Sequence, residues 1–243
     1  MNSPTSQSPF VFIHIPKTAG SSFRHHLNGI YGREQVAMVY DRDSRLNDLN
    51  QAIANNKLAI TGHISLDILR VAEFNATTNP FLFTFIRKPE NQVISHFLHK
   101  MRDRKWNSSK ELFPDFAEFL DSPFGNNWQS HFLSGWDKND WKKHSSDELK
   151  DAAKSNLKKF NFYADTDNYT KALLILRHKL GWKRFSTENR NVSNHHRTSD
   201  ALLLEFGSEL KGRNKVDQSL FTKAQRNCER EYRKLPLLRK LFK

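Results

Sequence analysis

The chain has 243 residues, of which 37% are hydrophobic and 12% aromatic; this is enough apolar material for the core of an α/β domain and excludes global disorder. Its 39 lysines and arginines outnumber 26 acidic residues, and the formal charge of +13 favours anionic partners such as nucleotides or acidic glycans. A single cysteine, Cys228, excludes an intramolecular disulfide and metal sites built from several cysteines, and it favours a reducing compartment.

Neither a signal peptide nor a membrane-spanning segment is expected. The first nine residues, MNSPTSQSP, are polar and lack the basic and apolar regions of a signal peptide. No apolar run approaches the ~20 residues that a bilayer requires. These features predict a cytoplasmic protein with no transmembrane segment and a flexible N-terminus over residues 1–9.

The first hundred residues alternate between strand and helix patterns. Four apolar runs predict strands, namely Phe10–Ile15, Val36–Tyr40, Leu58–Thr61 and Phe81–Ile86. A helix is expected over residues 22–30, and a second from Pro89 to about Arg104, because proline suits the first turn of a helix. This alternation predicts a mostly parallel central sheet with helices on both faces.

The rest of the chain is predicted to be mainly helical. Four helices are expected, over residues 115–120, 127–134, 146–159 and 167–180. A further strand is expected over 160–164 and a polar loop over 185–200. Residues 217–243 form a basic helical segment interrupted at Pro236. Because no repeat or long linker is present, we predict a single domain over residues 1–243, with a three-layer αβα architecture.

The segment IPKTAGSS, residues 15–22, lies between the first strand and the first helix and is called here the phosphate loop. Its backbone N–H groups and the helix N-terminus favour an anion, and its small residues allow close approach. Lys17 adds a positive charge, and Ser21 and Ser22 add hydroxyl donors; Ser21 is also a candidate helix cap. The alternative is an ordinary capped turn. The order differs from a Walker A motif, because the lysine precedes the only glycine.

A second basic residue follows the strand over residues 81–86. Arg87 leaves the carboxyl end of that strand, where ligands bind in open α/β sheets, and Ser95 follows about two helical turns later. The guanidinium and the hydroxyl are both donors to an anion. The alternative is an arginine at the sheet edge and a serine on a helix face. Together with the phosphate loop, the pair predicts a ligand with two separate phosphates.

The sequence PKTAGSS after an IHI strand resembles the 5′-phosphosulfate loop of the carbohydrate O-sulfotransferases, which include heparan sulfate 2-O- and 6-O-sulfotransferases and soluble bacterial relatives. The resemblance implies a P-loop-like fold and 3′-phosphoadenosine 5′-phosphosulfate (PAPS) as sulfuryl donor, with no metal. It implies that Lys17 contacts the leaving 5′-phosphate. The residues that would cradle this phosphate are Thr18, Ala19, Gly20, Ser21 and Ser22. Arg87 and Ser95 would bind the 3′-phosphate, although Lys88 replaces the family's usual aspartate.

His63 is the candidate catalytic base. An attacking hydroxyl must lose a proton, and histidine suits that role at neutral pH. His63 follows a short strand and Gly62, which places it at the carboxyl edge of the sheet. The segment GHISLD, residues 62–67, also resembles the Gly-His-Val-Ser segment that carries the base of heparan 2-O-sulfotransferases. The alternative is a histidine that only stabilises a turn.

The acceptor site is less sharply marked. Asn127, Gln129 and His131 belong to a segment that resembles a helix near the acceptor cleft of the same family, and amide groups suit sugar hydroxyls. Arg190 lies in a late loop that resembles one closing over PAPS, where it would contact either the 3′-phosphate or the acceptor. A solvated loop is the alternative. The expected acceptor is a hydroxyl compound, most simply a glycan or glycolipid.

Two other functions are compatible with parts of the pattern. A nucleotide-dependent kinase would use a variant phosphate loop, but the Walker A order is missing. A non-catalytic polyanion-binding protein would use the charge of +13, but runs of charge are commonly solvated surfaces. We therefore predict a PAPS-dependent O-sulfotransferase that yields adenosine 3′,5′-bisphosphate (PAP) and does not bind nucleic acid. The sequence does not indicate the oligomeric state.

Overall fold

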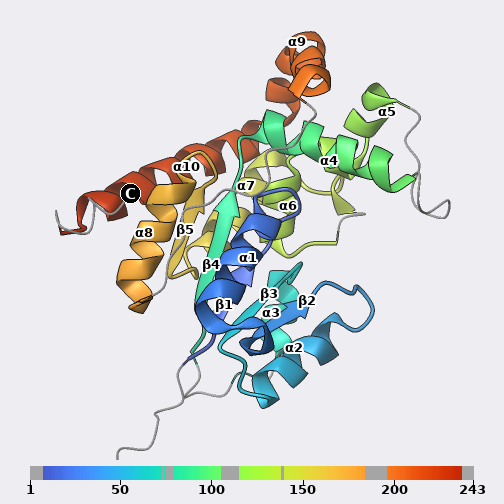
Figure 1. The fold of residues 1–243 in the computed structure, drawn as a ribbon. Coiled ribbons are helices and arrows are strands. Elements are labelled where there is room, and N and C mark those ends of the chain that lie inside the picture. The colour runs from blue at the N-terminus through green and yellow to red at the C-terminus, as the bar shows by residue number, and fades with distance from the viewer. Residues whose placement is uncertain are drawn as a thin grey trace, which may run out of the picture.

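The computed structural model describes residues 8–72, 74, 79–104, 115–137, 140–183 and 196–236. In this part of the chain one parallel sheet has the strand order β2-β3-β1-β4-β5 (Figure 1). Its strands are β1 (Phe10–Ile13), β2 (Val36–Val39), β3 (Ala59–Gly62), β4 (Phe81–Ile86) and β5 (Phe162–Asp165). The predicted fold class is confirmed: β4 has the predicted bounds, and the other strands overlap theirs.

Helices surround the sheet and make up most of the remaining described chain. The α-helices are α1 (Gly20–Tyr31), α2 (Arg45–Ala54), α3 (Leu66–Val71), α4 (Pro89–Arg104), α5 (Phe116–Leu120), α6 (Trp128–Ser134), α7 (Ser146–Leu157), α8 (Tyr169–Leu180), α9 (His196–Arg213) and α10 (Lys215–Arg233). Two short 3₁₀ turns are η1 (Arg33–Gln35) and η2 (Pro123–Gly125). In the described residues no helix has the length and apolarity needed to cross a membrane.

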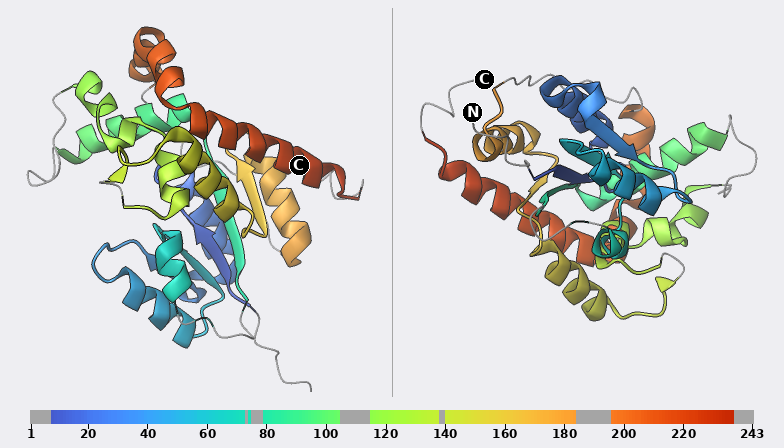
Figure 2. Two further views of the ribbon diagram at one scale, coloured as in Figure 1. Left: turned by 180° about the vertical axis from the view of Figure 1, so that it is seen from behind. Right: turned by 90° about the horizontal axis from the view of Figure 1, so that it is seen from below.

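Both faces of the sheet are buried, which explains why the central strands are apolar throughout rather than alternating. On one face, Phe10 and Phe12 of β1 and Phe83 of β4 pack with residues of α1 and α8. On the other face, Val11 and Ile13 of β1 pack with residues of α2, α3, α6, α7 and α10. The view from below shows the strands between these two helical layers (Figure 2, right). The chain therefore has the predicted three layers.

A third apolar cluster lies beyond the carboxyl ends of the strands. Phe97 of α4, Phe119 of α5 and Leu210 of α9 are buried in it. In Figure 1 the β4 arrow points toward α4, with α5 and α9 beyond it. These helices therefore stand over the sheet edge at which α/β folds bind ligands.

Strands β1 and β4 separate at this edge. They pair from Phe10↔Phe81 only as far as Phe12↔Phe83, whereas β4 pairs with β5 as far as Ile86↔Asp165. Thr84 Oγ1 donates a hydrogen bond of 2.8 Å to the carbonyl of Ile13, where the ladder ends. Beyond this point β1 continues into the phosphate loop and β4 into the segment that begins with Arg87, so these two segments leave neighbouring strands at the same edge of the sheet.

Three helices depart from the predicted elements. Helices α2 and α3 lie in segments for which no helix was expected, and α9 begins inside the predicted loop over 185–200. Helix α9 packs against α4, so its position depends on a contact distant in sequence. Its Leu204 is 90% exposed, and this mixture of buried and exposed apolar residues weakens the helical periodicity.

Candidate functional site

The phosphate loop has the backbone conformation of an anion-binding turn. Lys17 and Ala19 are left-handed, with φ of 69° and 66°, and Thr18 lies between them. The N–H of Thr18 donates to the carbonyl of Ile15 at 3.3 Å, and the turn leads from β1 into the N-terminus of α1. Ala19 is the N-cap of α1 and makes no side-chain cap, so the first-turn N–H groups face the loop. The predicted capping role of Ser21 is wrong, because Ser21 lies inside the helix.

The loop is held by its own turn and by the segment after β4. Thr18 is buried, and its Oγ1 donates a hydrogen bond of 2.8 Å to the carbonyl of Ile15. Gln92 Nε2 donates to the carbonyl of Pro16 at 3.1 Å. Arg87 Nη1 donates to the carbonyl of Lys17 at 3.0 Å. The two basic motifs of the sequence are thus in direct contact.

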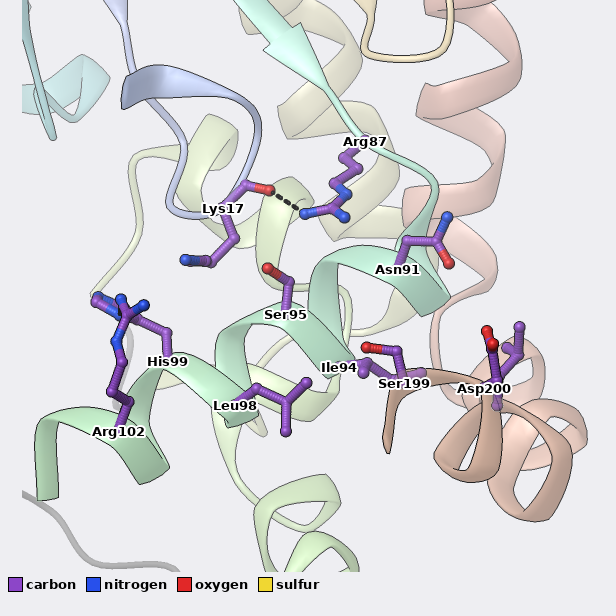
Figure 3. Close-up of a pocket in the computed structure, with 11 residues that line it drawn as sticks. Lys17, Arg87, Asn91, Ile94, Ser95, Leu98, His99, Arg102, Ser199 and Asp200 are labelled. Atoms are coloured by element: carbon purple, nitrogen blue, oxygen red, sulfur yellow. Dashed lines mark hydrogen bonds between the residues drawn. The ribbon is translucent and has the colours of Figure 1, made fainter. Parts of the chain in front are cut away.

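A pocket of about 320 Å³ lies between the phosphate loop, α4 and α9. Lys17, Arg87 and Ser95 line it together, from three different segments of the chain. In Figure 3 the Ser95 side chain rises from α4 between the side chains of Lys17 and Arg87. These three residues, which the sequence predicts to bind one ligand, line one pocket in the structure.

The pocket also contains polar residues that the sequence analysis did not identify. Asn91, His99 and Arg102 come from α4, and Ser199 and Asp200 come from α9 (Figure 3). The residues on α4 share a face with Ser95 at helical spacing, so that spacing was a usable signal. Ser199 and Asp200 had no such signal, because they lie within residues 185–200, which were predicted as a loop.

Burial shapes the electrostatics of the pocket. It lowers the pKa of Arg87, an effect that the nearby Asp167 carboxylate opposes. The guanidinium of an arginine nevertheless remains charged at neutral pH. Asp167 in turn has a raised pKa, first because of its own burial and then because of Asp165. The pocket therefore presents a partly desolvated guanidinium, which binds anions more strongly than one in water.

His63 lies just after β3, at the same sheet edge. Its Nδ1 is 2.7 Å from the backbone carbonyl of His14, and because a carbonyl only accepts, Nδ1 must carry the proton. The neutral ring therefore has its free lone pair on Nε2. Burial lowers the pKa of His63, and electrostatic interactions with Arg45 and His99 lower it further, against the opposing effect of the hydrogen bond to the His14 carbonyl. The neutral form, which can act as a base, dominates at pH 7.

Two aromatic residues fix the orientation of this ring. The imidazoles of His14 and His63 have centroids 4.7 Å apart, and the Tyr40 ring meets His63 edge-on at 4.8 Å. Tyr40 Oη lies 3.1 Å from His14 Nδ1 and 3.4 Å from Thr61 Oγ1. Burial places the pKa of His14 well below 6.5, so this ring is also neutral. The support is specific to one ring orientation, because it combines a tilted ring contact, an edge contact and a hydrogen bond.

Gly20 is required by the ring of His14. A Cβ at position 20 would lie 1.9 Å from His14 Nε2, so Gly20→Ala must displace the buried imidazole. We expect a loss of stability of about 1–3 kcal/mol, typical of overpacking. Urea unfolding measures it. Gly29→Ala in the same helix is the matched control: nothing lies within 4 Å of its Cβ, and a gain of about 0.5–1 kcal/mol is expected. Equal stability of Gly20→Ala and wild type would contradict the packing described.

Of the three residues predicted to contact the acceptor, Gln129 and His131 are buried and Asn127 is half-buried. The Gln129 side chain is buried, and its amide is bonded to the backbone of Arg87. Asn127 Oδ1 accepts from the N–H groups of Val216 and Asp217 at the start of α10. His131 is buried, which lowers its pKa to about 4. The hydrogen bonds described for Asn127 and Gln129 are to other groups of the protein. Contact with an acceptor therefore stays a prediction for all three residues.

Two further expectations concern the loop residue and metals. Arg190 lies outside the described residues. Among the residues that the structure describes, no three or more His, Cys, Asp or Glu side chains gather as a metal site would need.

The family model described as the sulfotransferase family matches residues 5–233, nearly the whole chain. No curated protein matches the sequence.

Proposed function

This chain belongs to the sulfotransferase family, and from that premise we propose that it transfers a sulfuryl group from PAPS to a hydroxyl of a carbohydrate or glycoconjugate. Transfer of a sulfuryl group follows from family membership. The donor, the acceptor class and the catalytic base are our proposal. The observation that carries the proposal is the contact between the two basic motifs: Arg87 Nη1 lies 3.0 Å from the Lys17 carbonyl, and both residues line one pocket with Ser95.

The residues of this pocket suit a donor that carries two separate phosphates. The phosphate loop offers the Lys17 cation and the N-terminus of α1, which has no side-chain cap, and these favour the 5′-phosphate side. Arg87 and Ser95 offer a charged fork and a hydroxyl for the 3′-phosphate. The volume, about 320 Å³, lies within the range of small-molecule sites. When bound, PAPS supplies the sulfuryl group.

The proposed chemistry is an in-line displacement at sulfur. His63 Nε2 accepts the proton of the acceptor hydroxyl while that oxygen bonds to sulfur and the sulfur–oxygen bond to the 5′-phosphate breaks. PAP is the leaving product. Lys17 offsets the negative charge that builds on the leaving phosphate. The hydrogen bond from His63 Nδ1 to the His14 carbonyl supports this assignment, because it leaves Nε2 as the basic nitrogen.

A direct assay tests the proposal. The purified protein is incubated with PAPS and a panel of glycans, glycolipids and small glycosides. PAP release is followed, and the mass of each acceptor is measured by mass spectrometry. We expect PAP to form only with an acceptor that gains the mass of one sulfuryl group, SO3. Protein that neither binds PAP nor releases it would contradict the proposal. Mg²⁺-dependent turnover of ATP would favour a kinase instead, and steeply salt-dependent polyanion binding without turnover would favour a binding protein.

A further inference from the structure

Gln129 is a buried glutamine whose side-chain amide pairs with both backbone groups of one residue of the candidate site. Its Oε1 accepts from the N–H of Arg87, and its Nε2 donates to the carbonyl of Arg87, both at 2.8 Å. Its relative exposure is 0%. A side chain that pairs with both backbone groups of one residue copies the hydrogen bonding of a neighbouring strand.

The topology explains why these two groups need a partner. The N–H and the carbonyl of one strand residue point to the same side, and those of the next residue point to the other. The carbonyl of Ile86 accepts from the N–H of Thr166, on the β5 side. The groups of Arg87 therefore face the β1 side. There β1 has already turned into the phosphate loop, so no strand is available, and Gln129 takes its place.

Gln129 is itself anchored from the opposite direction by the start of α10. The carboxylate of Asp217 accepts from the N–H of Gln129 at 3.1 Å and from the N–H of Ser130 at 2.7 Å, and it also accepts from Ser130 Oγ. Asp217 and Gln129 are both fully buried. The first turn of α6 is thus fixed to α10, and the Gln129 amide cannot shift without breaking buried hydrogen bonds.

We propose that Gln129 is a positioning residue for the 3′-phosphate: it holds the Arg87 peptide so that the guanidinium reaches both the Lys17 carbonyl and the nucleotide. This inference rests on the proposed function. The phosphate loop keeps bonds of its own, from Thr18 Oγ1 to Ile15 and from Gln92 to Pro16. Loss of Gln129 should therefore weaken recognition of the 3′-phosphate far more than that of the 5′-phosphate.

The test compares two nucleotides that differ only in the 3′-phosphate. Affinities for PAP and for adenosine 5′-phosphate are measured by calorimetry for wild type and for Gln129→Met, which keeps the side-chain length. We expect wild type to prefer PAP. In Gln129→Met we expect PAP affinity to fall about tenfold to a hundredfold, the effect of misplacing one charged hydrogen-bonding group. Affinity for adenosine 5′-phosphate should change much less.

A matched variant separates positioning from general loosening of α6. Asn156 braces the other end of that helix, donating from Nδ2 to the carbonyls of Leu133 and Ser134 at 2.9 and 3.0 Å. Asn156→Leu removes a buried amide of α7 that bonds to α6, and it should keep the wild-type preference for PAP. Arg87→Ala should lose that preference, and adding Gln129→Met to it should cause no further loss.

Each outcome has a distinct meaning. If wild type does not prefer PAP, the proposed function itself fails. If wild type prefers PAP and Gln129→Met keeps the full preference, the positioning role is overturned. An equal loss in Asn156→Leu would overturn it as well. If Gln129→Met does not fold, Gln129→Glu replaces it: it keeps an acceptor for the Arg87 N–H but lacks an N–H for the carbonyl, and a retained preference there would equally overturn the role.

Discussion

Replacement of His63 by alanine is expected to lower kcat for sulfuryl transfer about 10²–10⁴-fold, the usual contribution of a general base. The reason is geometric. His63 Nδ1 is committed to the His14 carbonyl at 2.7 Å, and only Nε2 remains to take the proton of the acceptor. Affinity for PAP should stay close to that of wild type, because His63 does not line the nucleotide pocket. Single-turnover rates and PAP titrations measure the two effects separately.

The pH profile provides an independent check on the same residue. Burial lowers the pKa of His63 from 6.5, and a base is active in its neutral form. Hence kcat/KM should rise with pH through a value below 6.5 and become level near neutrality. In His63→Ala this acidic limb should disappear. His25→Ala, on the exposed side of α1, is the control and should keep both the rate and the limb. Wild-type kcat in His63→Ala would reject His63 as the base.

The sheet was predictable from sequence because its strands are buried on both faces. The runs FVFI and FLFTFI are apolar apart from Thr84 and rich in β-branched and aromatic residues. Each of these strands leads through a short segment with a basic residue, Lys17 or Arg87, into a helix, which marks the ligand-binding edge. The juxtaposition of Lys17 and Arg87 follows from that logic, since β1 and β4 are neighbours in the sheet.

The internal bracing of the site was not predictable in the same way. Gln129 lies 42 residues from Arg87 in sequence, and its partner Asp217 lies another 88 away. A glutamine near the start of a helix offers no sign of which backbone it will meet. The sequence therefore suggested a sugar contact, whereas burial and two hydrogen bonds of 2.8 Å place it against the Arg87 peptide. Residues that brace a site are therefore harder to predict from sequence than residues that touch the ligand, because their partners are set by contacts that form only in the folded chain.

Removal of the Lys17 charge is expected to have the second large effect, a fall in kcat of about 10²–10³-fold in Lys17→Met. The sulfuryl group leaves a phosphate that gains negative charge as the sulfur–oxygen bond breaks, and Lys17 is the cation of the phosphate loop that lines the pocket. The backbone of Lys17 is left-handed, with a φ of 69°. The Arg87 guanidinium donates a hydrogen bond to the Lys17 carbonyl and so fixes the turn from which the lysine side chain extends. Because this charge matters most when the bond is breaking, PAP affinity should fall less than kcat.

Two variants distinguish the local charge from the overall charge of +13. Lys57→Met removes one lysine at the opposite edge of the sheet, just before β3, where its Nζ bonds to the Glu34 carbonyl. It should keep the wild-type kcat. Lys17→Arg keeps a cation but spreads it over a larger planar group, so it should recover only part of the rate. Since the proposed role of Lys17 concerns the leaving phosphate, a Lys17→Met enzyme with unchanged kcat and weakened PAP binding would reduce that role to ground-state binding.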